Sequence, residues 1–385
     1  MPSFFPFIAQ APITESLEWG TNVLEGYSGV EQRVKYRAYP RQRLEYRYFL
    51  REPRTQAKGK LKLAAGQADT WYVPVWQEAT NIVAAALDES ISVTTAYADY
   101  RAAGKAIVYY NDTTFEVVTT STINADSLDL SAGLTNNYPA GSVVAPLRQA
   151  ILDQNLGFED HVGGILRGTI AWSVTDNIAL TAYDLPTQYG GYGVFLTPVL
   201  RDGTGISREL FWPKDTIDFS TGVFTNVSRG DYARLGTSNV RVELGSRQTA
   251  WEFRRWLHGT QGQITPFWLP TFQKDIAVAS AFGAADVTIE IEDIGLSDVY
   301  GSPMFSHVAF CKTDGTYLLR EISGMASVGD TEQMTLDSAL GFIGDNDSFS
   351  HISFMPLVRL GSDRVELSWR RPDDLSAAFS VVGVL

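Results

Sequence analysis

Apolar and polar residues alternate along most of the chain, which predicts strands rather than helices. The clearest case is VKYRAYPRQRLEYRYFL (34–50), which alternates on both sides of a break at Tyr39–Pro40. A period of two, with one apolar and one charged face, is typical of a half-buried antiparallel hairpin. The charged face of this predicted hairpin is formed by Arg33, Lys35, Arg37, Arg41, Arg43 and Arg47.

Similar alternation recurs in VRVEL (240–244) and RVELSW (364–369). The latter and GTIAWSV (168–174) are the expected closing strands of the two halves of the chain. The dipeptide Asp314–Gly315, between two apolar runs, predicts a tight hairpin turn.

Helix signals are few. TAWEFRRWLHG (249–259) has the capping-box spacing from Thr249 to Glu252, and Gly259 is its expected stop. TQAKGKLKLAAG (55–66) is a second candidate, weakened by an internal glycine. Each half is therefore expected to hold one short helix.

A phrase of aromatic residues occurs twice, as GQADTWYVPVWQ (66–77) and as GQITPFWLPTFQ (262–273). A proline cannot donate a ladder hydrogen bond, so each copy is expected at a strand start, an edge or a bulge. We interpret the phrase as a core strand packed against the preceding helix. The alternative is an aromatic platform for stacking on sugars or nucleotides. The residues expected to be structurally essential in this strand are Trp71, Pro74 and Trp76 in the first copy and Phe267, Pro270 and Phe272 in the second.

Segments around the phrase match in the same order. Residues 107–118 resemble 309–320, and 145–148 resemble 355–359. A repeat of this length indicates two copies of a domain rather than a solenoid. The expected fold class is therefore mainly β (α+β), with two tandem related β-barrel-like or β-sandwich-like units, each with a short helix and its own core.

The expected organisation follows from the matched segments. Residues 1–24 are predicted to form an N-terminal arm and residues 25–175 the first β-rich unit. Residues 176–200, which are rich in turn formers, are predicted to connect it to a second unit at 201–385.

Charge is unevenly distributed along the chain. The net charge is −13, but residues 33–62 hold eleven basic and two acidic residues, a local charge of +9. This asymmetry predicts electrostatic docking between copies of the chain. The alternatives are a solvated surface and binding to nucleic-acid phosphates. Nucleic acid is the least favoured partner, because the remainder of the chain is strongly acidic.

No pattern points to catalysis, a metal or a cofactor. The single cysteine, Cys311, excludes an internal disulfide framework, and the four histidines lack zinc-site spacing. GDNDS (344–348) lacks the later glycine and glutamate of a calcium loop. We predict no catalytic, cofactor-binding or metal-ligating residues. We also expect no membrane span and no signal peptide, and therefore synthesis in a cytoplasm.

The segment LEWGTNVLEGYSGVEQRVKYRAYPRQRLEYRYFL (17–50), followed by the first copy of the phrase, resembles minor tail proteins of long-tailed (siphovirus-like) bacteriophages. The group is the distal tail, or baseplate and tail-tip, components. The resemblance is clearest over residues 17–80 and 240–275 and departs from a simple distal tail protein in having two copies of the unit. It implies a virion structural protein without catalytic residues.

The resemblance further implies a homo-oligomeric ring that connects the tail tube to the distal tip and central fibre. A hexamer is the first expectation and a trimer the second, because two similar units per chain let three chains form a pseudo-sixfold ring. The implied partners are the tail tube, tape-measure and other baseplate or fibre proteins. Two alternatives remain open: a host-glycan-binding adhesin of the tail tip and a peptidoglycan-cleaving tip enzyme.

Overall fold

The computed structural model describes residues 3–5, 7–27, 29–66, 68–153, 157–161, 165–199, 206–212, 214–220, 222, 224–228 and 232–384. Gln67, one position of the repeated phrase, lies outside these residues. The chain is mainly β, with two α-helices in the described part, one in each half. This confirms the predicted fold class of a mainly-β protein with short helices.

One antiparallel sheet runs through the middle of the molecule and takes strands from both halves. Its order is β13–β14–β5–β2–β28–β29–β20–β17. The strands span β13 Phe158–His161, β14 Ile165–Val174, β5 Arg41–Leu50, β2 Gln10–Glu18, β28 Arg364–Arg371, β29 Asp374–Gly383, β20 Arg234–Leu244 and β17 Ser207–Phe211. Strand β2 joins the halves, because it pairs with β5 of the first half and with β28 near the C-terminus.

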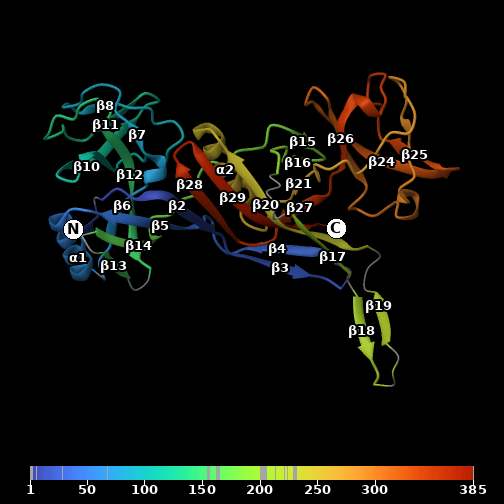
Figure 1. The fold of residues 1–385 in the computed structure, drawn as a ribbon, viewed down its shortest axis with the longest axis horizontal. Helices are drawn as coiled ribbons and strands as arrows, with labels where there is room; N and C mark the ends of the chain where they lie inside the picture. The colour runs from blue at the N-terminus through green and yellow to red at the C-terminus, as the bar shows by residue number, and fades with distance from the viewer. Residues whose placement is uncertain are drawn as a thin grey trace.

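A lobe of short strands lies at each end of this central body (Figure 1). Each lobe has an apolar core of its own. The first lobe contains β7 Thr80–Asn81, β8 Ser90–Ser92, β9 Lys105–Asn111, β10 Thr114–Ile123, β11 Ser127–Leu130 and the start of β12 Val143–Leu152. The second contains β22 Thr288–Glu292, β23 His307–Lys312, β24 Tyr317–Val328, β25 Thr331–Leu336 and β26 Phe349–Phe354.

The helices are α1 Pro53–Ala65 and α2 Arg247–Thr260. Helix α2 begins earlier than predicted, because the Ser246 side chain accepts a hydrogen bond from the Thr249 backbone N–H at 3.1 Å and so caps it. Gly259 is not the stop. It lies inside the helix, where a Cβ would come within 3.3 Å of Ala182.

The predicted hairpin over residues 34–50 is wrong in its pairing. Residues 31–35 form β4 Glu31–Lys35, which pairs with β3 Thr21–Glu25 in a separate two-stranded sheet. A tight turn, in which Gly26 N–H donates to the Val30 carbonyl at 2.8 Å, directs β4 back along β3. Tyr36, expected on the apolar face, is 68% exposed. Strand β5 instead lies between β2 and β14.

A second two-stranded hairpin, β18 Lys214–Asp218 and β19 Phe224–Ser228, projects away from the body (Figure 1). It precedes β20 in the chain, just as β3 and β4 precede β5. The two remaining small pairs of the second half are β15 Gln188–Tyr189 with β16 Tyr192–Gly193, and β21 Phe267–Trp268 with β27 Leu357–Leu360.

The same strand pairings recur in the same order in both halves. Strands β5 and β14 match β20 and β29, and β6 (Trp71–Pro74) with β12 matches β21 with β27. The lobe order β8–β11–β10–β9–β12 matches β22–β25–β24–β23–β26. Strand β13 beside β14 matches β28 beside β29. GTIAWSV (168–174) lies in β14, so its equivalent in the second half is β29. It is not RVELSW, which lies in β28.

The repeat in pairing begins before the first expected unit. Strand β1 (Ser3–Phe4) lies parallel to β6, and Val194 forms the matching parallel bridge to Trp268. Phe5 and Phe195, one residue further along each segment, are 2% and 1% exposed. Residues from the expected arm (1–24) and from the expected connecting segment (176–200) therefore pack into the central body.

The central body has one apolar core, not one in each half. A single cluster contains Trp71 and Trp172 of the first half together with Trp256, Phe267 and Phe379 of the second. The expectation of a separate core per unit holds only for the lobes. The two halves of the central sheet are packed as one piece.

Candidate assembly interface

The first copy of the repeated phrase is a buried strand packed on a glycine. Trp71, which is 0% exposed, donates its indole N–H to the Gly66 carbonyl at 2.9 Å. A Cβ at Gly66 would lie 2.4 Å from the Trp71 ring, so only glycine fits there. Pro74 and Trp76 are also buried. These aromatic side chains leave no ring face open for a sugar.

The second copy differs in its last aromatic. Phe267 and Pro270 are buried, but Phe272 is only half-buried and has a φ of 52°. Gly262 has a φ of 71°, and a Cβ there would lie 2.7 Å from the Asp363 carboxylate. Gln263 accepts a hydrogen bond from Arg359 at 2.8 Å. The shared glycine thus meets two different packing needs.

The β3–β4 hairpin carries part of the predicted charged face and is fastened to the second half. Arg33 donates to the Ile264 carbonyl at 2.8 Å, and Lys35 donates to the Gln261 side chain at 2.8 Å. Both partners follow helix α2. Arg47, by contrast, is exposed on β5.

Three predicted interface residues line a groove of about 820 Å³. Two of them are engaged within the chain, since Arg37 pairs with Glu18 at 3.1 Å and Arg43 with Asp153 at 2.6 Å. Arg41 is exposed and has no ion-pair partner among the described residues. The arginines of this groove are Arg37, Arg41, Arg43 and Arg364. The six predicted basic residues therefore divide into intramolecular contacts and two exposed cations, Arg41 and Arg47.

Glu31 is the main fastening point of the β3–β4 hairpin. Its side chain is 3% exposed and pairs with Arg359 at 2.8 Å, Arg234 at 3.1 Å and Arg33 at 3.8 Å. Burial alone raises the pKa of Glu31, but the hydrogen bond and charge of Arg359, with the charges of Arg234 and Arg33, outweigh it and lower the pKa. Glu31 is therefore ionised at neutral pH and ties the hairpin to β20 and β27.

A buried polar network, which we call the junction network, joins the halves around Glu15 of β2. Glu15 is 0% exposed and accepts hydrogen bonds from Gln42 of the first half at 2.7 Å and from Trp369 of the second at 3.0 Å. Arg254 of α2 lies 2.8 Å from Glu15 and 2.7 Å from Glu78. The junction network consists of Glu15, Gln42, Gln77, Glu78, Asp99, Arg254 and Trp369.

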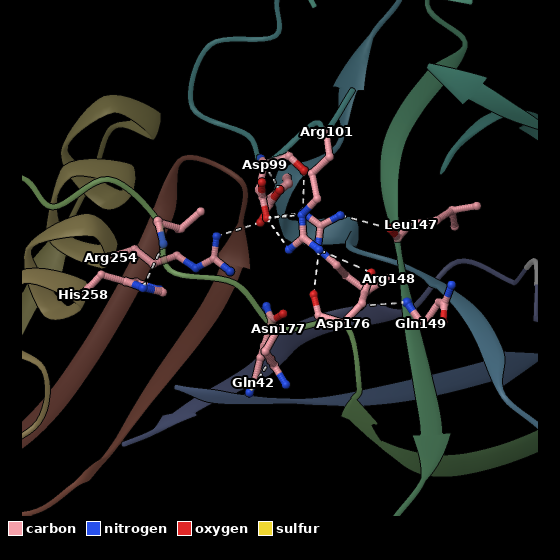
Figure 2. Close-up of polar contacts among 12 residues, drawn as sticks. Gln42, Asp99, Arg101, Leu147, Arg148, Gln149, Asp176, Asn177, Arg254 and His258 are labelled. Carbon is pink, nitrogen blue, oxygen red and sulfur yellow. Dashed lines mark hydrogen bonds and ion pairs between the residues drawn. The ribbon is translucent and has the colours of Figure 1, made fainter. Parts of the chain in front are cut away.

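The network continues into the first half through Asp99 (Figure 2). Arg101 lies 2.7 Å and Arg148 2.5 Å from the Asp99 carboxylate, and Arg254 approaches from the α2 side. Burial raises the pKa of Asp99, but the charges of Arg148 and Arg101 and the hydrogen bond from Arg101 lower it overall. Burial and the charge of Arg254 lower the pKa of His258 to about 3, so this ring stays neutral and accepts the Leu180 N–H at 3.2 Å.

Sequence reasoning missed the junction network, although one signal was present. Arg254 lies four residues after Ala250 and four before His258, on the helix face that also holds buried Phe253 and Leu257. A charged residue on the apolar face of a helix calls for a buried partner. No comparable signal marks Glu15, because its partner strand lies at the opposite end of the chain.

The projecting hairpin β18–β19, which we call the arm, is exposed along both strands. Phe219 and Phe224 near its tip are 63% and 67% exposed, and Trp212 at its base is 60% exposed. Soluble proteins rarely leave such a group of apolar side chains in water unless a partner covers them. The exposed apolar residues of β17 and the arm are Leu210, Phe211, Trp212, Ile217, Phe219, Phe224 and Val227.

Neither a metal-binding cluster nor a membrane-spanning helix is found among the described residues. Within the described ranges, no cluster of three or more His, Cys, Asp and Glu side chains is arranged to hold a metal ion. No helix of the described part is long and apolar enough to cross a membrane. No protein-family model matches the chain, and no curated protein matches it at a significant level.

Proposed function

We propose that this protein is a structural component of a phage tail tip or baseplate, where copies form a ring that connects the tail tube to the distal tip and central fibre. The observation that carries the proposal is the arm. An isolated two-stranded hairpin is at best marginally stable in water. A hairpin with both strands exposed and aromatic residues at its tip and base is built to lie against another protein.

The β3–β4 hairpin supports this role. It occupies the same place in the first half as the arm does in the second, and it lies against a neighbouring half. The arm has no such neighbour within the described part of the chain. Three chains supply six halves, so a trimer already provides a pseudo-sixfold ring, and we favour it over the hexamer. The exposed Arg41 and Arg47 are the basic residues best placed to meet acidic neighbours.

Deletion of the arm tests the proposal. In the variant, a short Gly-Ser linker replaces residues 214–228, whose strands β18 and β19 pair with each other and not with the central sheet. We expect the wild-type protein to form particles of three or six chain masses by mass photometry. The variant should remain a folded monomer with an unchanged far-UV circular dichroism spectrum.

A control variant changes a turn of the second lobe instead of the arm. A Gly-Ser pair replaces Gly329–Asp330 between β24 and β25, and this variant should assemble like the wild type. Wild-type protein that stays monomeric at every concentration tested, alone and with tail-tube protein, would rule out the ring. Normal assembly of the arm-deleted variant would show that the arm is not the assembly element.

A further inference from the structure

The central sheet ends in two unpaired edges that belong to different halves. Strand β13 pairs with β14 on one side, and β17 pairs with β20 on one side. Neither strand has a second partner among the described residues. An open edge offers a row of backbone N–H and C=O groups to another strand.

Two strands in the interior of the same sheet, β2 and β28, are the equivalents of β17 and β13, and these two are paired with each other. Strand β2 lies beside β5 as β17 lies beside β20, and β28 lies beside β29 as β13 lies beside β14. Strands β2 and β28 pair with each other along six residue pairs, from Ile13–Trp369 to Glu18–Arg364. The chain therefore contains one finished junction between halves and the two unjoined edges of a second.

Burial at equivalent positions shows what the missing strand leaves uncovered. Leu17 pairs with Gln42, the second residue of β5, and Leu210 pairs with Leu235, the second residue of β20. Leu17 has strands on both sides and is 1% exposed, whereas Leu210 has one neighbour and is 51% exposed. All five residues of β17 are exposed.

We infer that β17 of one copy pairs antiparallel with β13 of the next copy, and that this contact repeats the β2–β28 junction between chains. The inference rests on the proposed ring and assigns its interface. The contact is head-to-tail, because each copy offers one β17 edge and one β13 edge, and repetition of a single rotation closes a ring. Every half in that ring has the same neighbours, whether the junction lies within a chain or between chains.

The position of the arm follows from the same relation. The β3–β4 hairpin reaches across the internal junction to the segment after α2, where Arg33 contacts Ile264. The arm of one copy would therefore lie on the segment after α1 of the next. Helix α1 contains Arg54, Lys58, Lys60 and Lys62 and no acidic residue, whereas the arm carries two acidic residues, Asp215 and Asp218, against one basic residue, Lys214. The charges of the two surfaces are complementary.

A disulfide across the inferred junction tests the pairing directly. Counting along the matching ladders places Ser207 opposite Glu159, as Thr14 lies opposite Ser368. The full-length double variant Ser207→Cys/Glu159→Cys should form interchain disulfides on mild oxidation, and the ladder on a non-reducing gel should stop at the number of chains in the ring. The one native cysteine, Cys311, is buried, so background should be low. Each single variant and the pair Ser207→Cys/Ser121→Cys, whose second site lies in the first lobe, should give no ladder.

A variant that blocks the edge of β17 provides a second, independent test. Leu210→Lys places a charge on the open edge and should abolish the ring while the monomer stays folded. Leu87→Lys, at a leucine that is 52% exposed on the first lobe, should assemble normally. Rings that form without the disulfide and survive Leu210→Lys would overturn the junction and leave the proposed ring intact. A wild-type protein without rings and a double variant without a ladder would overturn both.

Discussion

Trp76 and Phe272 occupy the same position of the repeated phrase but have different surroundings. Trp76 is 6% exposed and packs edge-on against Tyr109, with the ring centroids 5.7 Å apart. Phe272 is half-buried, has a left-handed backbone conformation and lines a small pocket with Leu235 and Pro356. The same sequence position therefore lies inside the core in one half, whereas in the other it packs at the margin of the core beside a pocket near the β17 edge.

Alanine substitutions should reveal this difference. We expect Trp76→Ala to lower the free energy of unfolding by about 3–5 kcal/mol, as for other buried aromatic residues. Phe272→Ala should cost about half as much, since part of its surface stays in water. Urea titration of the two variants beside wild type measures both. An unchanged midpoint for Trp76→Ala, together with lost adsorption of phage to the host, would favour the glycan-binding adhesin instead.

Individual strands were predictable from the sequence, whereas several of their partners were not. Alternation correctly marks 41–50, 168–174 and 364–369 as strands, because it reports which side chains face inward. It carries no information on which strand lies alongside. Strand β4 pairs with β3 and not with β5, and β28 pairs with β2 from the other end of the chain. Buried charges such as Glu15 escape for the same reason, because their partners are long-range.

The β3–β4 hairpin should loosen in acid. A lowered pKa means that ionised Glu31 contributes stability above the ordinary glutamate pKa of about 4.3, and that this contribution is lost as the pH falls through the lower pKa of the folded state. We expect Glu31→Gln to lower the protection of β3 and β4 against hydrogen exchange at neutral pH. In the variant, this protection should then fall less on acidification than it does in the wild type. Hydrogen exchange by mass spectrometry measures this. Glu290→Gln in the second lobe is the matched control, and equal exchange in wild type and Glu31→Gln at neutral pH would contradict the role of Glu31.

Across the whole molecule, the two halves share one apolar core at the centre and have separate cores only in the lobes. The central core contains residues of both halves, and the junction network places Arg254 of the second half between Glu15 and Glu78 of the first. Loss of one partner from a buried ion pair leaves a charge without compensation. A substitution that breaks the junction network in one half should therefore destabilise both halves of the central sheet.

We expect Arg254→Met to destabilise the central body by about 3–5 kcal/mol. Because the core is shared, the substitution should lower the midpoint temperature of a single unfolding transition that includes both halves of the central sheet. Differential scanning calorimetry combined with hydrogen exchange in β5 and β29 measures this. The double variant Arg254→Met/Glu15→Gln should recover part of the loss, since one unpaired charge is removed. Destabilisation confined to the second half would disprove the shared unit.

The pairing of β2 with β28 also has a consequence for the time at which the protein becomes complete. The Trp369 indole and the Glu15 carboxylate that it contacts are 354 residues apart in the chain. At roughly 5–20 residues per second, a ribosome needs on the order of 20–70 s to travel that distance. Throughout that interval the nascent β2 lacks its neighbour, and a chain released early never gains it. Only a polypeptide translated to its last strands can close its own sheet, so a truncated product would keep β2 without its β28 neighbour.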